Sequence, residues 1–385
     1  MKRNVCLLQC AGNANQYQRR REMTKLTRRD FIKQVSAGGI AMATSGIAIP
    51  TMAQEALKVG IVYVSPVAEV GWTRSHDLAR QAMEAAFPGK IKTSVVANVA
   101  QMTDAERVFR DLVRQGNKLI FGTSFSQQTP IHKAAQTAPS VFFEHCSGIR
   151  QAKNVGTFEA RYYEGTYLSG VVAGKMSKSN TIAFIGGFPV PDVVGAANAL
   201  MLGARSVNPK VVCKTIWLNS WYDPGRERDA AKTLVAQGAD VIVSMTDTPT
   251  TVQVGEELNA WTIGYASDMS KYGPKKHLTS FLVDWSSHYI AAANDVFAGK
   301  WTSRHQWDGL KAGVVKMAPY NPAIPQDVIA LVNERQQAIT NGSLHPFTGP
   351  ISDQTGKLRV PKGSVIPDAE LKAINWLVEG MTGLG

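Results

Sequence analysis

Several side chains that could bind a small ligand stand at the ends of short apolar runs typical of buried strands. They are Phe125, Glu144, Asp247, Asp268 and Asp284. A carboxylate there could hydrogen-bond the polar edge of a ligand, because a buried polar edge left unpaired costs free energy. Asp247 and Asp268 are the best placed of these carboxylates. Either could equally cap a helix or lie at the surface, especially Asp247, since Thr248-Pro249 follows it.

Two other patterns resemble catalytic motifs, but neither meets the needs of the chemistry. Gly170 to Met176 is similar to a phosphate-binding loop, yet its glycines are one residue too close and Met176 replaces the hydroxyl residue needed for magnesium. We expect a helix whose small residues pack tightly on a sheet. His76 and Asp77 could form an acid/base pair, but adjacent side chains diverge on a helix, so Asp77 is expected to cap the helix N-terminus.

Other recognisable catalytic and metal-binding patterns are absent from residue 54 onward. This part of the sequence has no dinucleotide glycine fingerprint, no His-Glu-x-x-His and no Gly-x-Ser-x-Gly. No Cys/His grouping has metal-site spacing, and we expect neither metal nor cofactor. Cys146 and Cys213 lie in apolar, strand-like runs, which favours buried thiols, although an oxidising compartment would permit a bridge. Nothing recognisable argues for an enzyme.

Composition and charge point to a folded protein. The 385 residues are 44% apolar and 19% charged, which excludes a disordered or coiled-coil chain. The formal charge is +12, but residues 1–53 hold nine basic residues and two acidic ones. The remainder has 33 basic and 28 acidic residues, a charge of about +5. We therefore expect no nucleic-acid partner.

Residues 1–53 resemble a twin-arginine export signal. Thr27 to Lys33 holds an arginine pair followed by Phe and Lys, and a weakly apolar run over residues 35–49 comes next. That run is too short and too polar to span a bilayer; a basic amphipathic membrane helix is the alternative. Thr51 and Ala53 are small residues at the −3 and −1 positions that a signal peptidase recognises. We expect cleavage near Ala53, a periplasmic protein, and Met23 as the translation start.

The remaining sequence alternates β-branched runs with helical periodicity. Expected strands lie at 57–64, 91–99, 118–123, 140–145 and 155–159, and expected helices at 75–87, 103–115 and 127–138. A second series has strands at 181–186, 213–219, 240–246 and 261–266, and helices at 192–206, 225–237 and 249–259. Then come a crossing strand at 278–284 and helices at 285–298, 325–340 and 368–379.

This alternation predicts an α/β protein with two doubly wound lobes joined by a hinge. The first lobe is expected to comprise residues 57–161 and about 285–308, and the second lobe residues 162–284 and about 309–385. In open parallel sheets, ligands bind beyond the carboxyl ends of the strands. The cleft between the lobes is therefore the expected site.

Several separate blocks of the sequence occur in the order seen in one known family. The blocks are Glu164 to Met176, Phe184 to Gly187, Gly203 to Pro209, Gln237 to Ile242 and Gly349 to Lys357. They resemble the basic membrane protein family of ABC-transporter substrate-binding proteins, over essentially all of residues 57–385. The resemblance implies a type I periplasmic binding protein, with two lobes joined by three crossings that close on a ligand, often a purine nucleoside. The crossings are expected near Arg161, Asp284 and Gly309.

The resemblance also implies ligand contacts. The family's aromatic pair falls on Trp72 and Trp221, one in each lobe, and two aromatic faces can sandwich a purine. Core packing is the alternative for each ring. The family's Asn after the first aromatic residue is Thr73 here. The complete expected site is Trp72, Thr73, Phe125, Trp221, Asp247, Tyr265, Asp268 and Asp284.

The function implied is that of an exported, monomeric receptor that delivers a purine to the membrane permease of an ABC importer. Nucleoside-binding members hold the ribose with a Lys and an Asp, where this sequence has Val283 and Ala266. Ribose hydroxyls buried there would lose water without gaining partners, which predicts a free base such as adenine. The alternatives are a nucleoside, an amino acid or an amide, for which residues 122–126 offer hydroxyls, and an exported enzyme.

Overall fold

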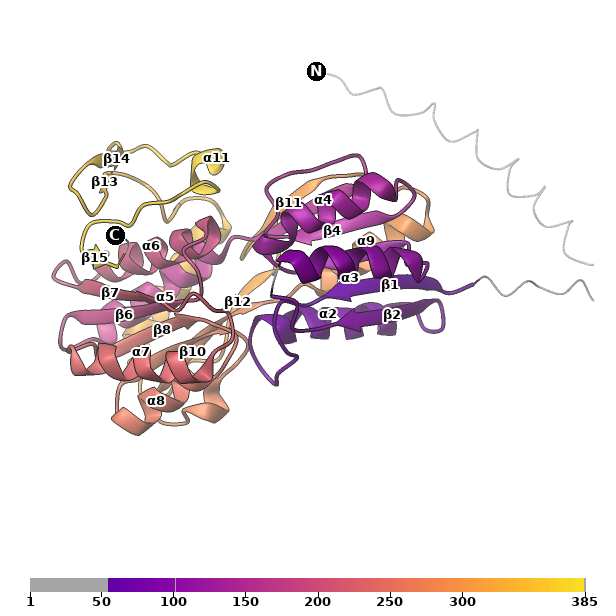
Figure 1. Cartoon of the computed structure of the whole chain (residues 1–385). Helices are drawn as coiled ribbons and strands as arrows, with labels where there is room; N and C mark the ends of the chain where they lie inside the picture. Colours follow the sequence, from indigo (N-terminus) through magenta and orange to yellow (C-terminus); the bar gives the residue numbers. More distant parts are fainter. Residues whose placement is uncertain (1–54, 101, 384–385) are drawn as a thin grey trace, which may run out of the picture. The chain divides into compact units, whose positions relative to one another are not determined.

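The computed structural model describes residues 55–100 and 102–383, so the expected export signal and its cleavage point lie outside the described residues. Two sheets, each with helices on both faces, make up the fold (Figure 1). The prediction of an α/β fold with two doubly wound lobes is confirmed.

The first lobe is built on a six-stranded parallel sheet with the order β11-β5-β4-β3-β1-β2. Its strands are β1 (Leu57–Val62), β2 (Ile91–Val96), β3 (Leu119–Gly122), β4 (Phe142–Cys146), β5 (Val155–Ala160) and β11 (His305–Asp308). Its helices are α2 (Trp72–Ala86), α3 (Met102–Arg114), α4 (Gln128–Thr137) and α9 (Ser286–Phe297). Along β1, Val59 and Ile61 pack on the side of α2, and Val62 packs on the side of α3. This period of two requires helices on both faces.

The second lobe has a seven-stranded sheet with the order β12-β10-β9-β8-β6-β7-β15, in which only β12 runs antiparallel to its neighbour among the described strands. Its strands are β6 (Thr181–Gly186), β7 (Val212–Trp217), β8 (Val241–Met245), β9 (Trp261–Ala266), β10 (His277–Val283), β12 (Val315–Met317) and β15 (Met381–Thr382). Its helices are α5 (Tyr162–Met176), α6 (Pro191–Arg205), α7 (Pro224–Ala236), α8 (Thr250–Leu258) and α10 (Gln326–Thr340).

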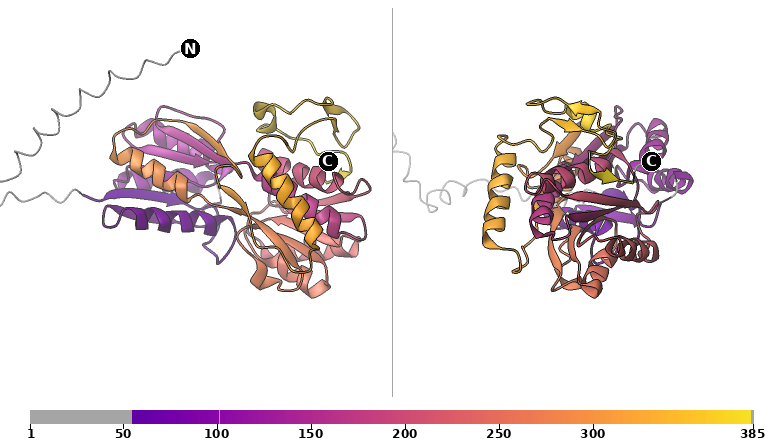
Figure 2. Two further views of the ribbon diagram at one scale, coloured as in Figure 1. Left: turned by 180° about the vertical axis from the view of Figure 1, so that it is seen from behind. Right: turned by 90° about the vertical axis from the view of Figure 1, so that its left-hand side faces the viewer.

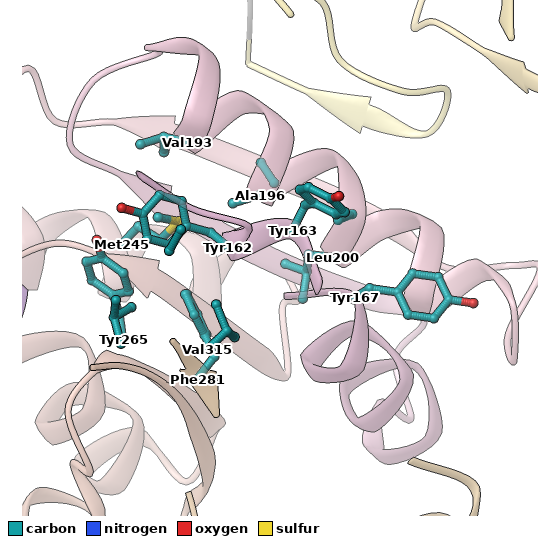
Figure 3. Close-up of a cluster of buried hydrophobic side chains, with 14 of the residues drawn as sticks. Tyr162, Tyr163, Tyr167, Val193, Ala196, Leu200, Met245, Tyr265, Phe281 and Val315 are labelled. Atoms are coloured by element: carbon teal, nitrogen blue, oxygen red, sulfur yellow. The ribbon is translucent and has the colours of Figure 1, made fainter. Parts of the chain in front are cut away.

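Helices α5 and α6 cross closely on one face of the second sheet. A Cβ atom at Gly170 would overlap the carbonyl oxygen of Leu200, and one at Gly174 would lie 2.6 Å from the carbonyl oxygen of Ala204. The run Gly170 to Met176 is therefore a tightly packed helix, as predicted, but its two glycines pack on α6 and not on the sheet as expected. Figure 3 shows the aromatic and aliphatic side chains that fill the space between this helix pair and the sheet. Helix α10 packs on the outside of α5 (Figure 2).

The chain passes between the lobes three times. It crosses from β5 to α5 at Arg161, from β10 to α9 at residues 284–285, and from β11 to β12 over residues 309–314. Arg161 ties two crossings together, because its Nε donates to the carbonyl oxygen of Trp307 (3.1 Å) and its guanidinium lies 4.2 Å from the centre of the Trp307 ring. It also pairs with Asp368 of the C-terminal segment at 2.9 Å.

The prediction of a helix over residues 368–379 is wrong beyond its first turn. Helix α11 (Asp368–Leu371) is followed by extended chain. The Asn198 side chain of α6 binds this chain, donating to the carbonyl oxygen of Trp376 (2.8 Å) and accepting the Val378 N–H (2.9 Å). β15 then joins the sheet edge beside β7. These tertiary bonds replace the helical ones. The hairpin of β13 (Ile351–Ser352) and β14 (Leu358–Val360) also lies in this segment.

The two cysteines lie in different sheets. Cys146 in β4 and Cys213 in β7 are both buried free thiols, and burial raises the pKa of each. This agrees with the interpretation of the cysteines as buried thiols. Within the described ranges, no helix has the length and apolar character that would allow it to cross a membrane.

Candidate functional site

A small cavity of about 40 Å³ lies at the carboxyl ends of strands from both sheets. The first lobe contributes Val64, Trp72, Thr123, Ser124, Phe125 and Ser147. The second lobe contributes Val190, Asp192, Val193, Trp221, Met245, Thr246, Asp247 and Tyr265. The mostly apolar lining with a few polar groups is typical of small-molecule sites. The cavity continues into a wider groove of about 540 Å³, which shares Val64, Phe125, Val190 and Trp221 with it.

Trp72 is the first residue of α2, so the helix begins three residues before the predicted start at Ser75. Its ring is half-buried. The indole Nε1 donates to the carbonyl oxygen of Thr123 (2.8 Å), and the ring lies parallel to that of Tyr265 at 6.2 Å between centres. The edge of Trp285 packs against it at 5.6 Å. Trp72 is thus part core residue and part cavity wall, and its orientation is held by several contacts.

Trp221 lies in the loop after β7 and is also half-buried. Its ring packs against Phe188 at 5.1 Å, and Gly187 lies so close that a Cβ atom there would overlap the indole. Phe125 begins the short helix η1 (Phe125–Gln127) and lines both the cavity and the groove. The structure therefore brings Trp72, Phe125 and Trp221 together around one space.

Asp247 follows β8 and is only 2% exposed, with its carboxylate bound to the first lobe. It accepts the Ser65 hydroxyl and the backbone N–H of Thr73, which lies 3.2 and 3.3 Å from its two oxygens. The hydroxyls of Ser65 and Thr73 are 2.6 Å apart. Burial raises the pKa of Asp247 to about 6, although these hydrogen bonds favour the ionised form. Asp247 thus caps a helix, but the helix belongs to the other lobe.

The prediction that Asp77 caps this helix is wrong. Because α2 starts at Trp72, Asp77 falls in its second turn, where it accepts from Arg80 (2.8 Å) and Gln81 (2.7 Å). Its neighbour His76 is buried and makes a 2.9 Å hydrogen bond to the hydroxyl of Tyr289. Burial holds the pKa of His76 well below its usual value. The two side chains therefore have separate structural partners.

Three of the strand-end carboxylates lie outside the cavity. Asp268 is exposed and accepts the Ser270 N–H (2.9 Å), while Asp284 pairs with Lys316 (2.9 Å) and accepts the Ser286 N–H at the start of α9 (3.0 Å). Glu144 is buried inside the first lobe, where Trp301 donates to it (2.7 Å). Ala266, at a φ of 58°, redirects the chain after β9 and carries Asp268 away from the cavity.

Asp268 and Asp284 instead line a separate groove near the crossings. Ala266 and Val283, the positions compared with the family's ribose-binding residues, line that same groove. Neither of them contacts the cavity that holds the two tryptophans. We therefore leave Asp268 and Asp284 out of the site proposed below.

The sequence did not single out Asp192 and Ser147, which the structure places in the cavity wall. Asp192 lies in the first turn of α6, and its carboxylate accepts the Ser147 hydroxyl (3.0 Å) and the Val193 N–H (3.0 Å). An acidic residue after a proline at a helix start is common and gave no signal. Among the residues that the structure describes, no group of three or more His, Cys, Asp or Glu could hold a metal ion.

Comparisons with known proteins agree with this architecture. The chain is 44% identical over 329 residues to a purine-binding protein of Brucella abortus, covering 86% of this chain and 94% of that protein. It is 35% identical over 295 residues to a Haloferax volcanii protein named as an ABC transporter glucose-binding protein, covering 77% of this chain and 75% of that protein.

A solved ABC transporter solute-binding protein of Aeropyrum pernix has the same fold, with a TM-score of 0.66 at 17% identity over 82% of this chain and 98% of that one. The family model described as "ABC transporter substrate-binding protein PnrA-like" matches residues 56–346. The chain therefore belongs to the Bmp family of PnrA-like ABC transporter substrate-binding proteins.

Proposed function

We propose that this substrate-binding protein binds a purine, as a free base such as adenine, in the cavity between its lobes. The observation that carries the proposal is the placement of Trp72 from one lobe and Trp221 from the other around a single cavity. The 44% identical relative named as a purine-binding protein supports the same class of ligand.

A planar base suits this cavity because the aromatic side chains in its walls can stack on the faces of the base, and stacking does not require a particular arrangement of polar groups. Each stacking contact is worth ~1 to 3 kcal/mol in base-binding proteins. The hydrogen bond from Trp72 to Thr123 and the packing of Trp221 on Phe188 hold both rings before the ligand arrives. Less side-chain entropy is then lost on binding. A ligand that contacts both lobes would favour the closed arrangement.

The preference for a free base rests on the comparison with the family alone, in which Val283 and Ala266 stand where nucleoside-binding members have ribose-binding groups. Both residues line the separate groove near the crossings and not the cavity, so neither offers a polar partner to a ribose bound there. We expect adenine to bind at least about tenfold more tightly than adenosine, because the ribose would lose water without these two partners. Titration calorimetry with adenine, guanine, adenosine and guanosine tests this. Equal or tighter binding of a nucleoside would contradict the preference for a free base, but it would still agree with a purine-binding receptor.

A nucleoside is the second candidate, and the wide groove favours it. The groove opens from the cavity and is lined by hydroxyl and amide side chains, namely Ser65, Asn98, Ser126, Asn219, Ser220 and Tyr222. Such groups could bind ribose hydroxyls while the base lies between the tryptophans. The glucose-binding name of one relative adds free sugars to the ligands worth titrating.

We further propose a monomeric, exported protein of the periplasm that passes its ligand to a permease without changing it. The two lobes would then move about the crossings at Arg161, residues 284–285 and residues 309–314. Mass spectrometry of small molecules released from the purified protein should find an intact purine. A chemically altered product after incubation with purine would favour an enzyme instead.

A further inference from the structure

One wall of the cavity carries a carboxylate with unused hydrogen-bonding capacity. Asp192 accepts one bond at each oxygen, from the Val193 N–H at 3.0 Å and from the Ser147 hydroxyl at 3.0 Å. An ionised carboxylate has about four lone-pair sites, so roughly half of them remain open. Among the described residues, no ion pair includes Asp192, and burial raises its pKa. A charge in this position requires further donors when the cavity closes.

Two tyrosines line the same spaces as Asp192, Tyr265 in the cavity and Tyr162 in a small second hollow that Asp192 also lines. Tyr265 lines the cavity, and none of the hydrogen bonds among the described residues uses its hydroxyl. The hydroxyl of Tyr162 is also without a partner, in a residue only 2% exposed. Figure 3 shows the two rings beside Met245, another residue of the cavity wall. Burial and the nearby charge of Asp192 raise the pKa of both tyrosines well above the usual value, so each remains an O–H donor.

The lining of the cavity therefore includes an acceptor, the carboxylate of Asp192, and a donor, the hydroxyl of Tyr265. A purine edge presents the complementary pair, an N–H group next to an unprotonated ring nitrogen, both at the N6 side and at the N9 side of adenine. A hydrogen bond to a charged carboxylate is stronger than a neutral one, so this contact should decide which bases bind.

We propose that the carboxylate of Asp192 accepts an N–H group of the bound base, while the hydroxyl of Tyr265 donates to the adjacent ring nitrogen. This assignment rests on the proposed function, because it supposes that a purine occupies the cavity. It makes Asp192 the residue that selects bases with a free N–H and rejects bases in which that hydrogen is replaced by a methyl group.

The test combines ligand methylation with substitution. Calorimetry with adenine, N6,N6-dimethyladenine and 9-methyladenine should be run on the wild type, Asp192→Ala, Asp192→Asn and the control Asp268→Ala, which removes a carboxylate outside the cavity. In the wild type, at least one methylated base should bind roughly tenfold or more weakly than adenine. That penalty should shrink to less than about threefold in Asp192→Ala, and it should keep its wild-type size in Asp268→Ala.

Asp192→Asn keeps the shape of the side chain but replaces an acceptor oxygen with an N–H donor, so the same penalty should shrink there if Asp192→Ala does not fold. Methylation penalties that are equal in the wild type and in a folded Asp192 variant would overturn the assignment of Asp192 alone. A wild-type protein that binds none of the three bases would overturn the proposed function instead.

Discussion

The carboxylate of Asp247, at the end of β8 in the second lobe, accepts the backbone N–H of Thr73 in the first turn of α2 in the first lobe, 174 positions away in the sequence. The N-cap position of α2 is Gly71, which has no side chain to bond these N–H groups. A carboxylate at a helix N-terminus also interacts favourably with the helix dipole. One lobe therefore supplies the cap that the helix of the other lobe lacks.

Because Asp247 is buried, we expect the folded protein to become less stable as the pH rises through the weakly acidic range. Burial raises its pKa to about 6, from an ordinary value of 3.8, so between these values the folded protein holds a proton that the unfolded chain has released. The free energy of unfolding should therefore decrease between about pH 4 and pH 6, by up to ~3 kcal/mol relative to Asp247→Asn. Urea unfolding of both proteins from pH 4 to 7.5 measures this. Parallel pH profiles would contradict it.

Replacing the two tryptophans should have different effects on the stability of the ligand-free protein. Trp221→Ala should weaken purine binding by ~1 to 3 kcal/mol, one to two decades in affinity, and change the melting temperature little, because its ring is half exposed beside Phe188. Trp72→Ala should weaken binding similarly but also destabilise the protein, because its ring packs on Tyr265 and Trp285.

Calorimetry and thermal melting check both variants. Trp261→Ala is the matched control, since Trp261 is half-buried at the start of β9 and lies outside the cavity. It should leave purine affinity at the wild-type value. Unchanged affinity in Trp221→Ala would show that this ring does not stack on the ligand.

Gly71→Ala should lower the unfolding free energy by more than the positive φ of residue 71 alone explains. Gly71 has a φ of 98°, which disfavours other residues, and a Cβ atom there would overlap the carboxylate of Asp247. Gly89 has a φ of 72° with no atoms near its Cβ position, so Gly89→Ala reports the backbone cost, about 1 kcal/mol. Urea unfolding should show at least ~1 kcal/mol more destabilisation for Gly71→Ala than for Gly89→Ala. Equal losses of unfolding free energy in the two variants would show that residue 71 and Asp247 can move apart without an energetic cost.

Gly170→Ala should destabilise the second lobe, although alanine is the better helix former. Its Cβ atom would overlap the Leu200 carbonyl oxygen, so α5 and α6 must move apart, at a cost of ~1 to 3 kcal/mol. The control is Gly195→Ala in α6, where the nearest atoms lie at 3.7 Å and alanine should stabilise by ~0.5 to 1 kcal/mol. Opposite signs of the two changes in unfolding free energy are the expected result. A stabilising Gly170→Ala would refute the close crossing.

The elements were largely predictable from the sequence because each strand or helix carries its own local period. The strands at 181–186 and 261–266 were predicted with the bounds that β6 and β9 have in the structure. The small residues of Gly170 to Met176 likewise indicated a tightly packed helix, but the sequence led us to expect packing on the sheet, whereas Gly170 and Gly174 pack on α6. The prediction of a helix over 368–379 was wrong because the local pattern contains no information about Asn198, whose side chain hydrogen-bonds the backbone of this segment.

By itself, then, the sequence determined the two α/β lobes and the family, and it indicated Trp72 and Trp221 as an aromatic pair with one member in each lobe. It did not determine which of the acidic residues at element ends faces the cavity. Asp247 lies at the cavity but is bound to the first lobe, Asp268 turns away after Ala266, and Asp192 enters from a helix start. Those differences depend on sheet order and on the direction of the chain beyond each strand, which bring together residues far apart in sequence. A local pattern carries no information about such partners, so only the tertiary structure could assign these carboxylates.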